Sequence, residues 1–271
     1  TTRSAYTGAN YSFCNKIFSN LLINPLNQPV TIGEFNMAAK NSLGGAMYGI
    51  NMYVILGDPT MKLALPQHKI VTDSIIIDVT QQQTDTIKAL DKVIVKGRIT
   101  DHGGATLNQF NGTLFPSVYD KKINTVTLLN DPDNPPFEFE VQNSVLFRGN
   151  VSVINGNFEF NFVVPKDINY AYGPGKISYY ARSSNSDAKG YTDQFYIGGF
   201  SDNPIVDENG PTIQIFLNDE KFVSGGICSP NPTLIIKLKD ENGINTTGNG
   251  IGHDIVAIID QQNDQQIILN D

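Results

Sequence analysis

Two adjacent residues, Asn155 and Gly156, constrain the fold of this chain more than any other feature of its sequence. They separate two runs, 151–154 and 157–160, in which apolar and polar residues alternate. Asn-Gly favours the two-residue loop of a type I′ β-hairpin, because both central residues of that turn need a positive φ angle. We therefore predict a hairpin whose turn fixes the register and places four apolar residues on one face: Val151, Val153, Phe158 and Phe160.

Alternation with a period of two continues through most of the chain beyond residue 66. Val93, Val95 and Ile99 alternate with basic residues, which is typical of a strand with one buried face. Two more strands are predicted at 176–180 and 194–197. Gly, Pro and Asn separate these runs, so we interpret residues 66–205 as an antiparallel β-sandwich of immunoglobulin-like architecture.

Residues 206–271 form a second predicted β module, which we expect to be truncated. Aliphatic residues recur at every second position in two of its runs: Ile213, Ile215, Leu217 and Leu234, Ile236, Leu238. The segment 254–259 is almost entirely apolar, so we expect it to be a more fully buried strand.

Residues 1–65 are the only part of the chain with helical periodicity. Apolar residues between 13 and 22 recur at steps of three and four, which predicts one amphipathic helix. A second helix is predicted to begin at Thr31, with Glu34 completing a capping box, and to end before Gly44. The apolar segment 51–56 is predicted to be a strand, and two helices followed by a strand are typical of the tail of an α/β domain. The whole chain is therefore expected to be mainly β.

Charge and composition exclude several classes of function. The 19 Lys and Arg residues against 27 Asp and Glu residues give a net charge of −8, which disfavours a nucleic-acid partner and a polybasic membrane anchor. No apolar run approaches the ~20 residues of a transmembrane helix. The chain does not begin with Met and closes on the apolar run 265–271, so we interpret it as a piece of a longer protein.

The residues that usually carry catalysis do not form a recognisable active site. The three histidines, His68, His102 and His253, lack a Cys, Ser or second His at triad or metal-ligand spacing. His253 is the one worth inspecting, because Asp254 follows it directly. Cys14 lies on the apolar face of the first predicted helix and is expected to be buried, whereas Cys228 is expected in an exposed loop. We therefore predict no catalytic residue in this chain.

Three acidic segments leave a calcium site open as an alternative. Carboxylates gather in loops that also contain Asn, Pro or Gly, at 130–134, 202–208 and 240–243. Oxygen ligands of this kind suit Ca²⁺, but none of the segments matches a complete EF-hand loop, and turns use the same residues. We expect no cofactor and assign no metal ligand.

Several short motifs occur in an order typical of one peptidase family. Residues 1–6 (Thr-Thr-Arg-Ser-Ala-Tyr), 38–41 (Ala-Ala-Lys-Asn) and 53–66 (Tyr-Val-Ile-Leu-Gly-Asp-Pro-Thr-Met-Lys-Leu-Ala-Leu-Pro) together resemble the last third of a gingipain-type cysteine peptidase domain. Further segments are similar to the sortases of type IX secretion systems in Bacteroidetes: 176–181, 195–199, 210–213 and 243–255. The resemblance therefore extends over nearly the whole chain.

This resemblance implies a caspase-like α/β peptidase fold for residues 1–65, of which the chain holds the C-terminal remnant, followed by β-sandwich domains. The family's catalytic His and Cys would precede Thr1. By matching to the gingipains, Thr2, Arg3, Ala5 and Tyr6 would line or rim the pocket for the substrate residue before the scissile bond. The chain alone is thus expected to be inactive.

The function implied for the parent protein is thiolate attack near the C-terminal sorting domain of secreted cargo. Transfer of the cargo to an amine of anionic lipopolysaccharide would attach it to the cell surface. The resemblance also implies export through the periplasm, an outer-membrane location and an outer-membrane β-barrel partner. Two alternatives stay open: a non-catalytic cell-surface adhesion or binding protein whose β-sandwiches bind carbohydrate or protein, and a pure scaffold.

Overall fold

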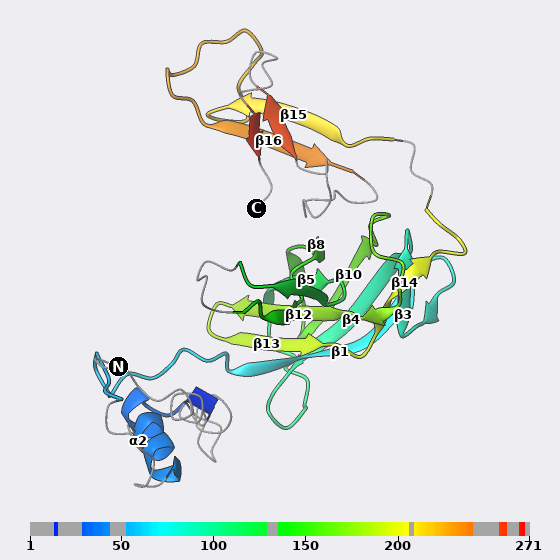
Figure 1. Cartoon of the computed structure of the whole chain (residues 1–271). Coiled ribbons are helices and arrows are strands. Elements are labelled where there is room, and N and C mark those ends of the chain that lie inside the picture. The colour runs from blue at the N-terminus through cyan, green and yellow to red at the C-terminus, as the bar shows by residue number, and fades with distance from the viewer. Residues whose placement is uncertain are drawn as a thin grey trace. The chain divides into compact units, whose positions relative to one another are not determined.

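The computed structural model of the chain describes residues 14–15, 29–43, 53–128, 135–205, 209–240, 255–258 and 266–268 (Figure 1). The chain divides into two compact units, Thr1–Pro66 and Gln67–Asp271, which are described separately below. Among the described residues, none of the helices combines the length and the apolar character that a membrane crossing requires.

The first unit contains the predicted second helix, α2 (Ile32–Leu43). Its capping box is formed as expected, because the backbone N–H of Thr31 donates to Glu34 Oε2 at 2.7 Å and the N–H of Glu34 donates to Thr31 Oγ1 at 3.2 Å. The same hydrogen bonds to Thr31 lower the pKa of the Glu34 carboxyl. In this helix Ala39 is fully buried, whereas Met37 is exposed.

The first predicted helix and the strand predicted at 51–56 also belong to the first unit. Residues 14–15 are helical, and the rest of the first predicted helix lies outside the described residues. The strand predicted at 51–56 is wrong for its described part, because residues 53–56 form no strand and Val54 and Leu56 are exposed. A strand needs a neighbour to pair with, and the isolated bridge between Thr31 and Lys62 in the described part of this unit does not involve residues 53–56.

The second unit begins with a β domain. Its strands are β1 (His68–Ile77), β2 (Gln82–Gln83), β3 (Thr86–Ala89), β4 (Lys92–Thr100), β5 (Gly112–Tyr119), β6 (Ile123–Val126), β7 (Glu138–Val141), β8 (Val145–Arg148), β9 (Val151–Val153), β10 (Asn157–Val163), β11 (Gly173–Pro174), β12 (Lys176–Ser183), β13 (Asp187–Thr192) and β14 (Tyr196–Phe200). The mainly β fold class predicted from the sequence is confirmed.

Strand order gives the domain its immunoglobulin-like arrangement. Hydrogen-bonded strands follow the order β10-β4-β1-β13-β12-β5-β8, and β9 also pairs with β5. β1 runs antiparallel to β4 and, at its first residues, parallel to β13, so that it joins a β10-β4-β1 sheet to a β13-β12-β5 sheet. In chain order these are the positions of strands E-B-A and G-F-C in an immunoglobulin domain.

The core lies between these two sheets. Val93, Val95 and Ile99 of β4 have no exposed surface, as their alternation predicts. Aromatic rings from both sheets also pack in the core: the centroids of Phe158 on β10, beside β4, and Tyr179 on β12 lie 5.7 Å apart. On one side of the core, the ring of Phe147 on β8 stacks on Phe160 at 5.5 Å and on Phe162 at 5.2 Å.

The Asn155–Gly156 turn is formed as predicted, with φ angles of 51° and 76°. Ile154 and Asn157 exchange both backbone hydrogen bonds across it, at 2.9 and 3.0 Å. The two strands do not continue as a ladder, however, because β9 pairs with β5 while β10 pairs with β4. The turn thus carries the chain from one sheet of the sandwich to the other, and Val153, Phe158 and Phe160 still point into the core.

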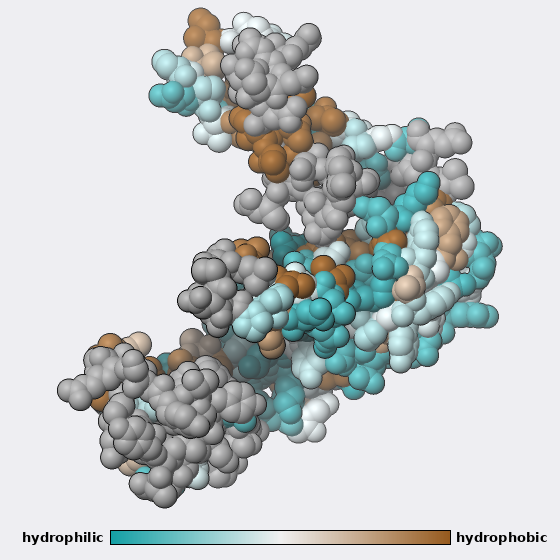
Figure 2. Space-filling model, viewed as in Figure 1, coloured by the Kyte–Doolittle hydropathy of each residue, from teal (hydrophilic) through white to brown (hydrophobic). Residues whose placement is uncertain are grey.

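In the described part of the second predicted β module, the strands form two-stranded ribbons, β15 (Thr212–Leu217) with β16 (Leu234–Lys239) and β17 (Val256–Ile258) with β18 (Gln266–Ile268). The alternating residues of β15 and β16 share one face, and Ile213 and Ile215 are about 60% exposed (59% and 61%), part of the apolar surface shown in Figure 2. The expectation of a more fully buried strand at 254–259 is wrong, since Val256 and Ile258 are exposed. A two-stranded ribbon buries little apolar surface by itself.

Candidate functional site

All of the site residues suggested by the family resemblance lie outside the described residues. This holds for Thr2, Arg3, Ala5 and Tyr6, and also for His253, for the acidic segment 130–134, and for parts of the other two acidic segments: 206–208 of segment 202–208 and 241–243 of segment 240–243. Their roles stay predictions. Within the part of the chain that the structure describes, no group of three or more His, Cys, Asp and Glu residues lies close enough to hold a metal ion.

Cys14 and Cys228 are both exposed. The expectation for Cys228 is confirmed, but the buried Cys14 expected from the helical pattern is wrong. Periodicity tells which side of a helix is apolar, but it does not tell whether another element covers that side.

The two described histidines occupy structural positions. The ring of His68, at the start of β1, lies edge-on to the ring of Phe110 with the centroids 6.3 Å apart. His102 lies in the turn after β4, where its backbone carbonyl accepts a hydrogen bond from Lys69 Nζ at 3.5 Å.

The turn at residues 57–60, which belongs to the peptidase-like motif, is tied to the start of α2. Asp58 Oδ1 accepts hydrogen bonds from the backbone N–H of Thr60 at 2.8 Å and from Thr60 Oγ1 at 2.7 Å, and these bonds lower the pKa of the Asp58 carboxyl. The Pro59 carbonyl accepts the N–H of Gly33 at 2.8 Å. Within this unit, the turn at residues 57–60 is therefore hydrogen-bonded to the N-terminus of α2.

One candidate site for a ligand among the described residues is an open groove at an irregularity in β1. The register between β1 and β4 shifts between Thr72 and Ser74, and Asp73 in between forms an ion pair with Arg98. Two cavities of about 570 and 780 Å³ both include Asp73 and Ser74 in their walls. β-Bulges often lie beside binding sites because they redirect side chains.

The walls of the two cavities differ in character. Ile75 is the single apolar residue of the smaller cavity, whose other walls are hydroxyl, amide and carboxylate side chains from β1, residues 83–85, Thr192 and Gln194. The larger cavity lies beside β4 and β10 and includes the ion pair between Lys96 and Glu159, with 2.9 Å between nitrogen and oxygen. This groove can bind a polar ligand through hydrogen bonds.

Behind the groove, Thr72 Oγ1 lies 2.8 Å from the hydroxyl of Tyr179. Burial raises the pKa of Tyr179 well above its ordinary value, so its hydroxyl stays neutral at physiological pH. The pair links β1 to β12 and has a structural role.

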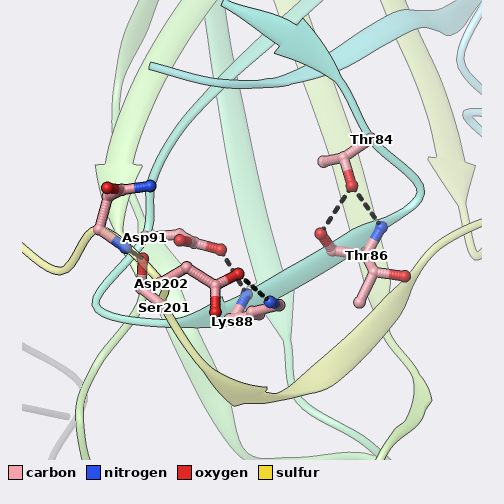
Figure 3. Close-up of polar contacts among 7 residues, drawn as sticks. Thr84, Thr86, Lys88, Asp91, Ser201 and Asp202 are labelled. Atoms are coloured by element: carbon pink, nitrogen blue, oxygen red, sulfur yellow. Dashed lines mark hydrogen bonds and ion pairs between the residues drawn. The ribbon is translucent and has the colours of Figure 1, made fainter. Parts of the chain in front are cut away.

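A second polar network, on the side of the domain formed by β3 and β14, is shown in Figure 3. Asp91 is buried, and its Oδ2 accepts the backbone N–H of Lys88 at 2.7 Å. Lys88 Nζ lies 2.7 Å from Asp202 Oδ2, and this hydrogen bond raises the pKa of Lys88. Asp202, one of the acidic residues considered for calcium, therefore ties the segment after β14 to β3.

The sequence reasoning missed the groove, although a signal was present. Ile70 and Ile75 are both apolar and both buried in β1, yet they lie five positions apart. An odd separation cannot keep two residues on the same face of a regular strand. Polar residues 72–74 between them were the sign of a bulge.

Comparison with solved structures finds a similarity that covers most of the chain. The crystal structure of dimeric latent PorU from Porphyromonas gingivalis matches 90% of this chain with 31% sequence identity and a TM-score of 0.53. This chain spans 23% of the PorU chain. The fold and order of the sequence motifs thus resemble those of one part of a larger protein.

Two further matches are too distant to bear on the fold. Two structures of a β-glucosidase from Listeria innocua cover 59% of the chain and 20% of their own, with 11% and 12% identity and TM-scores of 0.22 and 0.20, which are too low to carry an argument. No protein-family model matches the sequence, and no curated protein is significantly similar to it.

Proposed function

We propose that this chain is a segment of a PorU-type protein of a type IX secretion system. The observation that carries the proposal is the similarity to PorU, at 31% identity over 90% of the chain. The order of motifs from residue 1 to residue 255 agrees with it. In this proposal, the parent protein is a cysteine endopeptidase and sortase that removes the C-terminal sorting signal of secreted cargo and attaches the cargo to the cell surface.

Within that protein the chain contributes no catalytic residue and acts as pocket wall and scaffold. Thr2, Arg3, Ala5 and Tyr6 would contact the substrate beside the scissile bond. The implied partners are cargo sorting domains, an outer-membrane β-barrel protein of the secretion system and anionic lipopolysaccharide as acceptor. The implied location is the outer face of the outer membrane, reached through the periplasm, and no cofactor is required.

The isolated chain is expected to have no peptidase activity, because a thiolate mechanism needs a paired general base that the chain does not supply. Incubation with Arg-, Lys- and sorting-domain-containing peptides should give no cleavage above a protein-free control, as followed by mass spectrometry. Cys14→Ala and Cys228→Ala serve as matched variants. Cleavage that a thiol blocker abolishes, and that either variant loses, would contradict the proposed division of roles.

The polar groove at Asp73 favours one alternative, a non-catalytic surface protein whose sandwich binds a polar ligand. The two functions differ in what loss of the protein does to cargo. Loss of a sortase would leave cargo unprocessed. Loss of an adhesion protein would leave cargo processing intact and would reduce adhesion.

A further inference from the structure

The outward side of strands β5, β12 and β13 gathers positive charge and aromatic rings. β12 buries Ile177, Tyr179 and Ala181 in the core, so the residues between them face outward. Backbone pairing of β12 with β5 and with β13 brings the outward residues of all three strands side by side. We call this surface the basic face, and it consists of Phe115, Lys176, Tyr180, Arg182, Lys189 and Tyr191.

Two cations of the basic face lie over aromatic rings. Lys176 Nζ is 5.9 Å from the ring centroid of Tyr191, and Arg182 Cζ is 5.5 Å from that of Phe115. The ring of Phe115 in turn stacks on Tyr180, with the centroids 6.1 Å apart. A ring face attracts a cation but has no net charge, so the positive charge of each side chain remains available to an anion.

The cations of β4, on the opposite sheet, are arranged differently. Each of them forms an ion pair with a carboxylate: Lys92 with Asp78, Lys96 with Glu159 and Arg98 with Asp73. Lys176, Arg182 and Lys189 form no ion pair with any residue that the structure describes. In a chain with a net charge of −8, the basic face is therefore a local concentration of positive charge that is not neutralised.

Lys189 also has a second cation as its direct neighbour. In the pairing of β1 with β13, the residue opposite Lys189 is Lys69. Like charges directly opposite each other on a sheet are destabilising. Asp187, the single carboxylate on β5, β12 and β13, accepts hydrogen bonds from the backbone N–H of Gln67 at 3.2 Å and from the Tyr180 hydroxyl at 3.4 Å instead of pairing with either lysine. A carboxylate supplied by a partner would relieve the repulsion between the two lysines.

We propose that the basic face binds an extended acidic segment of a partner polypeptide. Lys176 and Arg182 lie six positions apart on β12, which is about 20 Å along a strand, and a segment of about six extended residues has that length. Three strands make a face about 15 Å wide, so its area is about 300 Å². Each partner of a typical protein complex buries about 800 Å². The face therefore suits one segment of chain and not the surface of a folded domain.

The residues of the basic face favour a polypeptide over an acidic polysaccharide. The guanidinium of Arg182 can donate two parallel hydrogen bonds to the carboxylate of an Asp or Glu side chain. Tyr and Arg are also the residues that contribute most to binding at protein interfaces. A sugar binds by stacking on an open ring, but Lys176 and Arg182 already lie over the rings of Tyr191 and Phe115. The inference does not depend on the proposed function.

The test uses the full 271-residue chain and a fluorescein-labelled octapeptide of alternating Glu and Thr, followed by fluorescence anisotropy at low ionic strength. Its Kd should be about tenfold lower than that of an octapeptide of alternating Gln and Thr with the same label. Added salt should remove most of this difference, because it screens exposed charges. Arg182→Gln and Lys189→Gln should each raise the Kd for the Glu peptide about threefold.

Lys96→Gln is the matched control, because it removes the same charge from the opposite sheet, where Lys96 is paired with Glu159. It should leave the Kd unchanged, and circular dichroism should show the same sheet content for all variants. Equal binding of the Glu and Gln peptides, or an equal loss in Lys96→Gln and Arg182→Gln, would overturn the proposal. Polygalacturonate and phosphatidylglycerol vesicles serve as competitors at matched charge concentration. If either displaces the Glu peptide more effectively than unlabelled peptide does, the occupant is a polysaccharide or a membrane and the assignment to a polypeptide is wrong.

Discussion

Gly156→Val is expected to destabilise the sandwich by about 3 kcal/mol. Gly156 has a φ of 76°, which is costly for a β-branched residue. A Cβ at this position would also lie 2.5 Å from the backbone carbonyl oxygen of Leu107, and a backbone atom cannot move aside as a side chain can. Since the turn links the two sheets, the strain falls on the whole domain, and denaturant unfolding should show a lower midpoint.

Gly104→Val separates the backbone strain of a positive φ from the steric clash with Leu107. Gly104 also has a positive φ, 92°, but a Cβ there would meet nothing within 4 Å. Its replacement should cost only the backbone strain, about 1–2 kcal/mol. If both variants lose the same stability, the close approach of Gly156 to Leu107 has no energetic consequence and this description of the turn is wrong.

Phe160→Ala is expected to cost about 4 kcal/mol of unfolding free energy. Phe160 is 6% exposed, and its ring stacks on Phe147 and lies near the rings of Phe158 and Phe162. Removal of the ring leaves a cavity that stacked, rigid neighbours cannot fill by a small shift. Chemical denaturation followed by circular dichroism measures the loss.

The matched control is Phe137→Ala, because Phe137 lies just before β7 and is 65% exposed. Its replacement should change the unfolding free energy by less than about 0.5 kcal/mol. A similar loss for both variants would mean that Phe160 does not lie in the core and that the alternation in β10 was assigned to the wrong face.

Features that depend on neighbouring residues could be predicted from the sequence. The turn at Asn155 follows from the φ preference of Asn-Gly, and the capping box of Thr31 and Glu34 follows from their spacing. The burial of Val93, Val95 and Ile99 follows from alternation alone. Each of these signals is contained within a few residues, so no knowledge of distant parts of the chain is needed.

Features that depend on a distant partner could not be predicted. The apolar segment at 53–56 looks like a strand, but strand formation depends on a neighbour that local sequence does not reveal. Val256 and Ile258 are apolar yet exposed, because burial requires a second layer. The pairing of β9 with one sheet and β10 with the other could not be predicted either, because a simple hairpin would have the same alternation of apolar and polar residues.

The candidate site also combines a local feature that the sequence contains with a feature that depends on distant segments. Alternation along β1 contains the irregularity at Asp73, but the groove itself forms only when β4, β10 and the segment after β13 come together. The family resemblance suggested Thr2, Arg3, Ala5 and Tyr6 instead, by position in a motif and without any information about packing.

Mass spectrometry of secreted proteins from cells that lack this protein tests the central claim most directly. The gene is disrupted in the source organism, and the surface and supernatant proteins are compared with those of the parent strain and of a complemented strain. We expect cargo proteins to retain their C-terminal sorting domains and to be lost from the surface, with both properties restored by complementation. Cargo that is still processed and still attached to the surface would contradict assignment of this chain to a PorU-type sortase.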